Sequence, residues 1–174
     1  ANDLSGGSVS TAGDLNDDGF SDLSIPNEIT VDVRVFLGDG AAYDIAYGGT
    51  FYAFVRAGDV GLTTLPKDFA PLVEKGMAIK RAIMAARPIP HPFEADLSFL
   101  YGTIFIGPPQ EPGAHSRNVC VFAEGEVDRS PTGTGVSARL AIHHARGETS
   151  LNEPITIESI IGSRFSGRVV QTTN

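Results

Sequence analysis

The chain has 174 residues, of which 41% are apolar and 20% charged, a length and balance typical of one soluble domain with at most a small appendage. Its net charge of −8 at pH 7 disfavours nucleic acid and anionic membranes as partners, and no apolar run approaches the roughly 20 residues of a membrane helix. A single cysteine excludes an internal disulfide and no signal-peptide pattern opens the chain, so we expect a cytoplasmic protein.

Residues 1–28 differ from the rest because they are rich in Gly, Ser, Asn and Asp and almost free of long apolar side chains. Within them, oxygen-bearing residues alternate around a glycine turn, which is the spacing by which a short loop wraps Ca²⁺. The predicted ligands are Asp14, Asn16, Asp18, the backbone carbonyl of Phe20, and Asp22. The stretch from Gly13 to Leu23 resembles one calcium-binding FG-GAP repeat, although one propeller blade cannot bury its face alone. A solvated acidic turn without a metal is the alternative.

Residues 29–174 form the second predicted unit, and they open with strands. A period of two runs through the apolar residues Val31, Val33, Val35 and Leu37. The sequence GDG at 38–40 predicts a hairpin turn, and further strands are predicted at 43–47 and 50–56. The intervening Gly48 and Gly49 suit a bulge, a close backbone approach or an ordinary strand break.

The longest predicted helix covers residues 66–87, with Gly76 as a weak point and Pro88 as a stop. Its helical spacing is carried by Phe69, Leu72, Val73, Ile79 and Ile83. Later strands are predicted at 99–106, 118–123, 155–161 and 165–170. This order of elements favours an α+β domain in which a curved antiparallel sheet, or barrel, wraps around a central apolar helix.

That central helix is predicted to follow the sequence DRSPTGTG at residues 128–135. Ser130 can cap a helix and Pro131 suits its first position, while glycines in a first turn expose bare backbone N–H groups to an anion. Thr132 adds a hydroxyl and Asp128 a negative charge at the same place. The pattern therefore indicates either a site for a carboxylate or a well-capped core helix that ends near Gly147.

Cys120 is the single thiol, and it lies between apolar residues of the strand predicted at 118–123. A catalytic cysteine has to be exposed and activated, whereas a buried one behaves as a small apolar residue. We therefore expect Cys120 to be inert.

The motif at 128–135 resembles the second active-site motif of the proline racemase family, in the trans-3-hydroxy-L-proline dehydratase branch where Thr replaces a catalytic Cys. Three more blocks resemble the family in the same order: DIAYGGTFYA at 44–53, RNVCVFA at 117–123 and ESIIG at 158–162. The resemblance implies one lobe of a fold built from two pseudo-symmetric lobes, with the site in the cleft between them.

The resemblance also implies chemistry at the α-carbon of a proline-type amino acid, without a cofactor. Carried onto this chain, Asp128 would hold the substrate ammonium, and the backbone N–H groups of Gly133 and Thr134 would bind the carboxylate. Phe122 would pack on the ring. Thr132 would occupy the second catalytic position, where it favours dehydration over racemisation because a hydroxyl is a poor base.

The family's first-lobe Met-Cys-Gly-His motif does not occur in the 174 residues, so the chain is expected to be weakly active or inactive alone. A first-lobe chain or a second copy of this chain is the expected protein partner. Two other functions stay open: a non-catalytic module that binds a proline-type ligand, and a calcium-dependent interaction protein.

Overall fold

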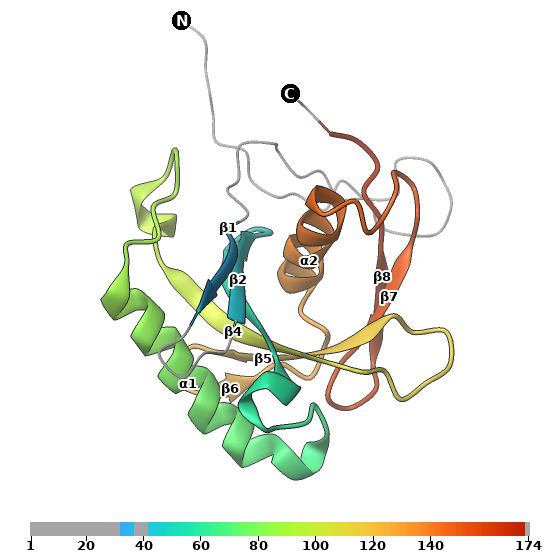
Figure 1. Ribbon diagram of the computed structural model, residues 1–174, viewed down its shortest axis with the longest axis horizontal. Helices are drawn as coiled ribbons and strands as arrows, with labels where there is room; N and C mark the ends of the chain where they lie inside the picture. Colours follow the sequence, from blue (N-terminus) through green and yellow to red (C-terminus); the bar gives the residue numbers. More distant parts are fainter. Residues whose placement is uncertain (1–31, 37–41, 173–174) are drawn as a thin grey trace, which may run out of the picture.

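A computed structural model describes residues 32–36 and 42–172 of the chain. The strands in this part form one eight-stranded sheet with the order β1-β2-β3-β4-β5-β7-β8, and β6 pairs with β5 (Figure 1). The strands are β1 (Asp32–Phe36), β2 (Ala42–Tyr47), β3 (Phe51–Arg56), β4 (Leu100–Gly107), β5 (Ser116–Phe122), β6 (Glu126–Val127), β7 (Ile155–Glu158) and β8 (Arg164–Gly167). The helices are α1 (Phe69–Ala86), α2 (Gly133–Ala145) and the short 3₁₀ turns η1 (Ala57–Val60), η2 (Pro66–Asp68) and η3 (Ala95–Leu97).

The α+β class is confirmed, but the sheet is mixed rather than antiparallel. The pairs β3–β4 and β5–β7 are parallel, and the other pairs are antiparallel. Each parallel pair is joined by a crossover that contains a helix, α1 in the first case and α2 in the second. Parallel neighbours need such long crossovers, and the two helices that were predicted between strands provide them.

The two helices cover opposite faces of the curved sheet (Figure 1). Helix α1 packs on β4 and β5, while α2 lies between the two ends of the sheet and contacts β2, β3 and β8. Successive side chains of a strand point to opposite faces, so Val119 and Val121 pack towards α1 whereas Cys120 joins the cluster under α2. Cys120 is fully buried.

Helix α1 confirms the longest predicted helix, which begins here with the turn η2. Leu72, Ile79 and Ile83 are buried as expected, but Phe69 at its first position is exposed. Gly76 permits close packing, because an added Cβ would lie 2.8 Å from the Cβ of Val121. No helix in residues 32–36 and 42–172 is long and apolar enough to cross a membrane.

Candidate active site

The helix expected at Pro131 begins instead at Gly133, because Thr132 leaves the helical conformation with φ 68° and ψ 103°. Ser130 does not cap the helix: its hydroxyl accepts a hydrogen bond from the N–H of Thr132 at 3.0 Å and closes a short turn. The prediction failed because cap propensity ignores this local alternative bond. The predicted end is confirmed, since Gly147 has φ 68° and donates its N–H to the carbonyl of His144.

Asp128 and Thr132 are joined directly at the N-terminus of α2. The hydroxyl of Thr132 donates to one carboxylate oxygen of Asp128 at 2.9 Å, and the N–H of Ser130 donates to the other at 2.8 Å. A carboxylate has about four acceptor positions, so each oxygen can still accept a bond from a ligand. The two predicted site residues thus lie together, with Asp128 only partly buried.

The two glycines of the first helical turn lie in different surroundings, and each is suited to its position for a different reason. Gly133 is exposed and open, with only a ring carbon of Phe165 at 4.0 Å from an added Cβ. Gly135 is buried, and an added Cβ would lie 2.4 Å from the terminal carbon of Ile104. Gly133 therefore provides the access that the sequence predicted, whereas Gly135 allows α2 to pack closely on β4.

Backbone donors are available at this helix mouth. The first helical bond runs from the N–H of Val136 to the carbonyl of Thr132 at 2.8 Å. The N–H groups of Gly133 and Thr134 precede it and have no acceptor within the helix. They point where the helix dipole favours an anion.

Aromatic side chains from β3, β4 and β5 stand beside the helix mouth. The hydroxyl of Tyr52 lies 2.8 Å from that of Thr134, and burial raises the pKa of Tyr52, so it stays protonated near neutral pH. Tyr101 meets Tyr52 edge-on at 5.7 Å and stacks on Phe122 at 5.6 Å. Phe122 is thus half-buried with one face on Tyr101, in the wall where the sequence predicted a substrate contact.

Cys120 lies directly under this site, although the sequence had placed it outside the chemistry. Burial raises the pKa of its thiol to about 12, although the neighbouring Thr132 side chain acts to lower it. Cys120 is therefore unsuited to act as a base, which agrees with the expected inertness.

A second set of contacts, from the β7–β8 side, supports the loop at residues 128–132 that precedes α2. Ser163 donates to the carbonyl of Arg129 at 2.9 Å, and Ser159 contacts Ser163 at 2.7 Å. The neighbouring Glu158 pairs with Arg117 at 3.0 Å, and both side chains are buried. Desolvation opposes ionisation of Glu158, but hydrogen bonds from two backbone N–H groups and from Arg117 outweigh it and lower its pKa.

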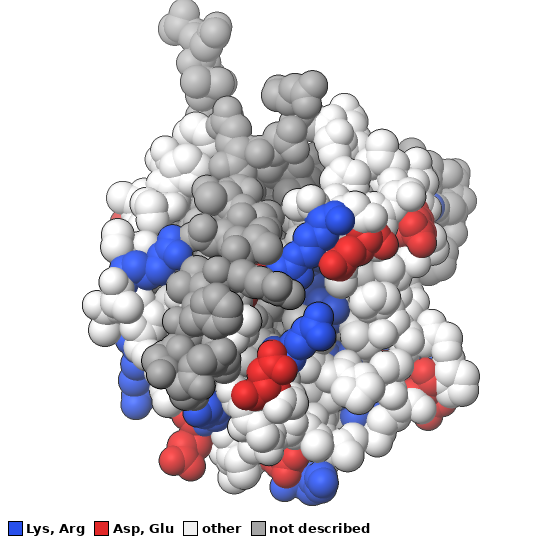
Figure 2. Space-filling model, viewed as in Figure 1, with Lys and Arg blue, Asp and Glu red and all other residues white. Residues whose placement is uncertain are grey.

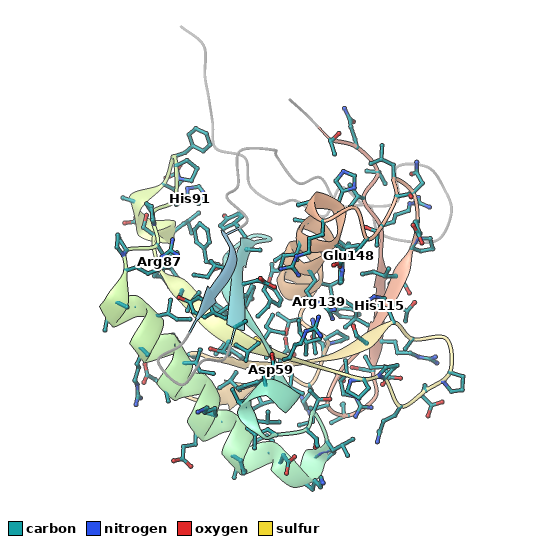
Figure 3. The ribbon with its side chains drawn as sticks, viewed as in Figure 1. Asp59, Arg87, His91, His115, Arg139 and Glu148 are labelled. Carbon is teal, nitrogen blue, oxygen red and sulfur yellow. The ribbon has the colours of Figure 1, made fainter. Side chains whose placement is uncertain are left out.

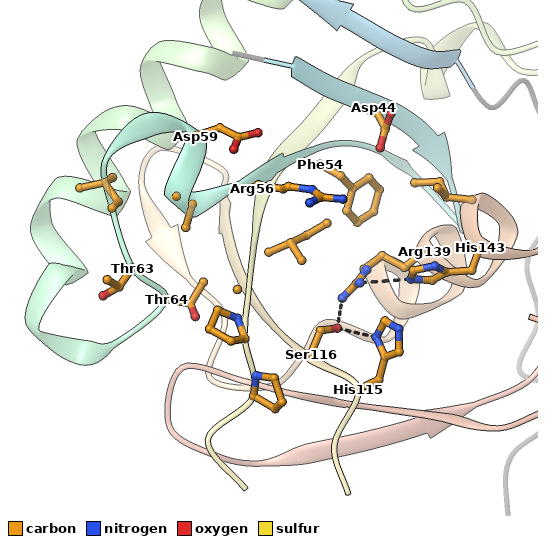
Figure 4. A pocket seen from close by; sticks show the side chains of 18 of the residues that line it. Asp44, Phe54, Arg56, Asp59, Thr63, Thr64, His115, Ser116, Arg139 and His143 are labelled. Carbon is orange, nitrogen blue, oxygen red and sulfur yellow. Dashed lines mark hydrogen bonds between the residues drawn. The ribbon is translucent and has the colours of Figure 1, made fainter. Parts of the chain in front are cut away.

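A cavity of about 1040 Å³ lies elsewhere, beside the C-terminal half of α2 (Figure 4). Figure 3 shows Arg139, Glu148 and His115 on this side of the molecule, away from His91 near the end of α1. The cavity contains three guanidinium and three carboxylate groups, from Arg56, Arg139, Arg146, Asp44, Asp59 and Glu148. Charges of both signs are interspersed on the face in Figure 2 as well, so the cavity has no single-sign character.

Three residues of the site were missed from the sequence: Tyr52, Asn118 and Arg139. An added Cβ at Gly48 would lie 2.1 Å from the carbonyl oxygen of Thr134, so the glycine lets the β2–β3 turn touch α2. The sequence had left a bulge, a close approach and a strand break open there, and the structure shows the close approach. The available signals were polar residues in apolar surroundings, since Asn118 interrupts a buried strand and Arg139 lies on an apolar helix.

The predicted calcium ligands at 14–22 lie outside the described residues. Within residues 32–36 and 42–172, no three His, Cys, Asp or Glu side chains are grouped closely enough to hold a metal ion.

Comparison with known protein families assigns this chain to one of them. The family model described as proline racemase matches residues 24–174. The chain belongs to the proline racemase family. The match begins after the loop at 14–22.

The relatives that match this chain are named for three activities: dehydratase, racemase and epimerase. The chain is 55% identical over 130 residues to a trans-3-hydroxy-L-proline dehydratase from Colwellia psychrerythraea, covering 75% of this chain and 37% of the relative. A crystal structure of a probable proline racemase from Agrobacterium radiobacter, with bound carbonate, matches with a TM-score of 0.72 at 37% identity. A hydroxyproline epimerase from Agrobacterium vitis, with bound trans-4-hydroxy-L-proline, matches with a TM-score of 0.70 at 36% identity.

Both structural matches cover 79% of this chain and 41% of the solved chain. The chain thus spans about two fifths of the length of the proteins it matches. The matches support the one-lobe fold that was expected from the sequence.

Proposed function

We propose that this chain supplies the Thr132 side of a site that dehydrates trans-3-hydroxy-L-proline, or a related proline-type amino acid, without a cofactor. The observation that carries this proposal is the 2.9 Å hydrogen bond between Thr132 and Asp128 beside the open first turn of α2. A racemase or epimerase needs a base on each side of the α-carbon, and a protonated threonine hydroxyl does not provide one. The relative that is 55% identical is also named as a dehydratase.

In this proposal the ligand's two charged groups are held at opposite ends of one short loop. The substrate carboxylate accepts bonds from the N–H groups of Gly133 and Thr134, where the helix dipole adds to the attraction. The substrate ammonium donates to Asp128, whose oxygens keep free acceptor positions. The ring packs against Phe122, which Tyr101 supports from behind.

The reaction breaks the Cα–H and Cβ–O bonds and forms a Cα–Cβ double bond. A base takes the α-proton, and the β-hydroxyl leaves with a proton as water. In this proposal Thr132 is a hydrogen-bonding group beside the reacting carbons, with its hydroxyl oriented by Asp128. The base has to come from a first lobe on another part of the protein or another chain, since the single thiol of this sequence is buried and protonated.

The test is isothermal titration of the 174-residue chain with trans-3-hydroxy-L-proline, followed by an assay for the unsaturated product in the same sample. We expect binding without turnover. Asp128→Ala should abolish binding, and Thr132→Ala should leave it within about twofold because backbone groups hold the carboxylate. Asp96→Asn, a change of an exposed carboxylate, is the matched control. Unchanged affinity in the Asp128 variant would refute the site assignment.

A non-catalytic module that binds a proline-type ligand is the second candidate, and the open helix mouth at Gly133 favours it because its backbone N–H groups can hold a carboxylate without any reaction. Adding a first-lobe domain from a related family member discriminates between the two. Turnover that appears only in the mixture supports the half-site, whereas unchanged binding with no turnover supports the module. The calcium-dependent role remains a prediction for residues 14–22, which thermal unfolding with and without Ca²⁺ would test.

A further inference from the structure

Asn118 is a buried polar residue that touches the site from below. It lies in the middle of β5 with no exposed surface, and its amide nitrogen donates to the carbonyl oxygen of Pro131 at 3.0 Å. That carbonyl belongs to the peptide unit that leads into Thr132. The bond therefore acts on the one unit whose orientation sets the unusual φ of 68° at Thr132.

Arg139 fixes Asn118 in this orientation. Its guanidinium donates to the side-chain oxygen of Asn118 at 3.0 Å. It also donates to the hydroxyl of Ser116 at 2.6 Å (Figure 4). A guanidinium only donates and a carbonyl only accepts, so the two partners together determine which end of the Asn118 amide is oxygen. The nitrogen is thereby left facing Pro131.

Burying the charged guanidinium of Arg139 costs free energy, so its hydrogen bonds have to compensate for the lost hydration. Only 3% of its surface is exposed, and its described hydrogen-bond partners are Ser116, Asn118 and His143 rather than a carboxylate. Desolvation and the nearby Arg56 lower its pKa to about 10, which still leaves it charged near neutral pH. Burying such a charge requires good hydrogen-bond partners. Two of the partners of Arg139, Ser116 and Asn118, lie in β5.

We propose that Asn118, locked by Arg139, is a positioning residue that holds Thr132 in its left-handed conformation at the mouth of α2. Arg139 orients the Asn118 amide, the amide holds the Pro131 carbonyl, and the held peptide keeps the Thr132 hydroxyl on Asp128. The same peptide aims the N–H groups of Gly133 and Thr134 at the ligand carboxylate. This inference rests on the proposed function for its ligand, but its structural step concerns the backbone alone.

The competing explanation is that Asn118 and Arg139 only stabilise the core. Thr103 offers a matched control, because its buried hydroxyl donates to the carbonyl of Gly76 at 2.9 Å on the opposite, α1 side of the sheet. Thr103→Val removes a buried bond to a backbone carbonyl without touching the loop. Asn118→Asp keeps the acceptor for Arg139 and removes the donor to Pro131.

The experiment compares the wild-type chain, Asn118→Asp and Thr103→Val in three measurements: urea unfolding, affinity for trans-3-hydroxy-L-proline, and amide hydrogen exchange followed by NMR. In Asn118→Asp we expect affinity to fall roughly tenfold, the loss that corresponds to one hydrogen bond. We also expect exchange to accelerate by a similar factor at the bonded N–H groups of Thr132 and Val136. In Thr103→Val we expect lower stability with unchanged affinity and unchanged exchange at these two amides. Wild-type affinity and exchange in Asn118→Asp, or equal effects in both variants, would overturn the proposal.

The outcomes separate this inference from the proposed function. If the wild-type chain does not bind trans-3-hydroxy-L-proline, the proposed ligand is wrong, yet exchange at Thr132 and Val136 still decides whether Asn118 positions the loop. If Asn118→Asp does not fold, Arg139→Lys provides the same test, because one ammonium cannot replace both guanidinium bonds to Ser116 and Asn118. Faster exchange at Thr132 in Arg139→Lys than in Thr103→Val supports the inference, and equal exchange in the two variants contradicts it.

Discussion

Thr132 carries a backbone conformation that a β-branched residue rarely adopts, and this leads to a prediction with an unusual sign. Alanine and glycine at position 132 both lack the hydroxyl that binds Asp128, so each should lose roughly 1 kcal/mol from that bond. They differ in the backbone: a non-glycine residue at positive φ costs about 1–3 kcal/mol, while glycine costs about 0.5–1 kcal/mol of extra chain entropy. Thr132→Gly should therefore be more stable than Thr132→Ala by about 0.5–2 kcal/mol.

Urea unfolding measures this difference, provided that the slope of the free energy against urea is the same in both variants. Thr134 is the matched control, because it also loses a hydroxyl contact, to Tyr52, but lies inside α2. There glycine should be less stable than alanine by about 1 kcal/mol, the opposite order. If alanine is the more stable residue at both positions, the positive φ of Thr132 does not strain the chain and the reasoning fails.

Three further predictions concern the frame around the site. Glu158→Gln should lower stability by about 3–5 kcal/mol because it leaves the buried Arg117 without its charge partner, and thermal unfolding measures the loss. The pKa of Glu158 is lower in the folded chain than its ordinary value of 4.5, so this stabilisation is complete above about pH 4.5 and should decline as the pH falls below it; a wild-type minus variant difference that does not shrink in acid would contradict this. Gly48→Ala should cost about 3 kcal/mol or more, since the added carbon meets backbone atoms of α2, while Gly58→Ala, with nothing within 4 Å, should cost nothing measurable in the same urea titration. Cys120 should resist a maleimide in the native chain and react after unfolding, which mass spectrometry detects; rapid native labelling would show that the thiol is accessible.

Local patterns were sufficient for most elements of the fold. The helix at α1, the strands β2 to β5 and the end of α2 at Gly147 follow from periodicity and glycine placement, which depend on neighbouring residues only. The start of α2 did not follow, because the choice between a cap and a turn at Ser130 depends on where the Pro131 peptide is held. That peptide is held by Asn118, thirteen residues earlier in the chain.

The site divides in the same way. Asp128, Thr132, Gly133 and Thr134 are close in sequence, so their types and spacing already indicated an anion site at a helix mouth. Their partners come from other strands: Tyr52 from β3, Cys120 from β5 and the wall that includes Phe122. No spacing rule connects Tyr52 with Thr134, 82 positions later, or Arg139 with Asn118, 21 positions earlier, which is why these two contacts were not predicted.

The sequence by itself determined the amphipathic elements, the helix mouth with its threonine and acid, and the family, because each depends on residues that are neighbours along the chain. Only the tertiary structure decided the parallel pairs, the positive φ of Thr132 and the buried bonds that hold it. The physical reason is that these features are set by contacts between distant segments, where packing and hydrogen-bond partners override local preference.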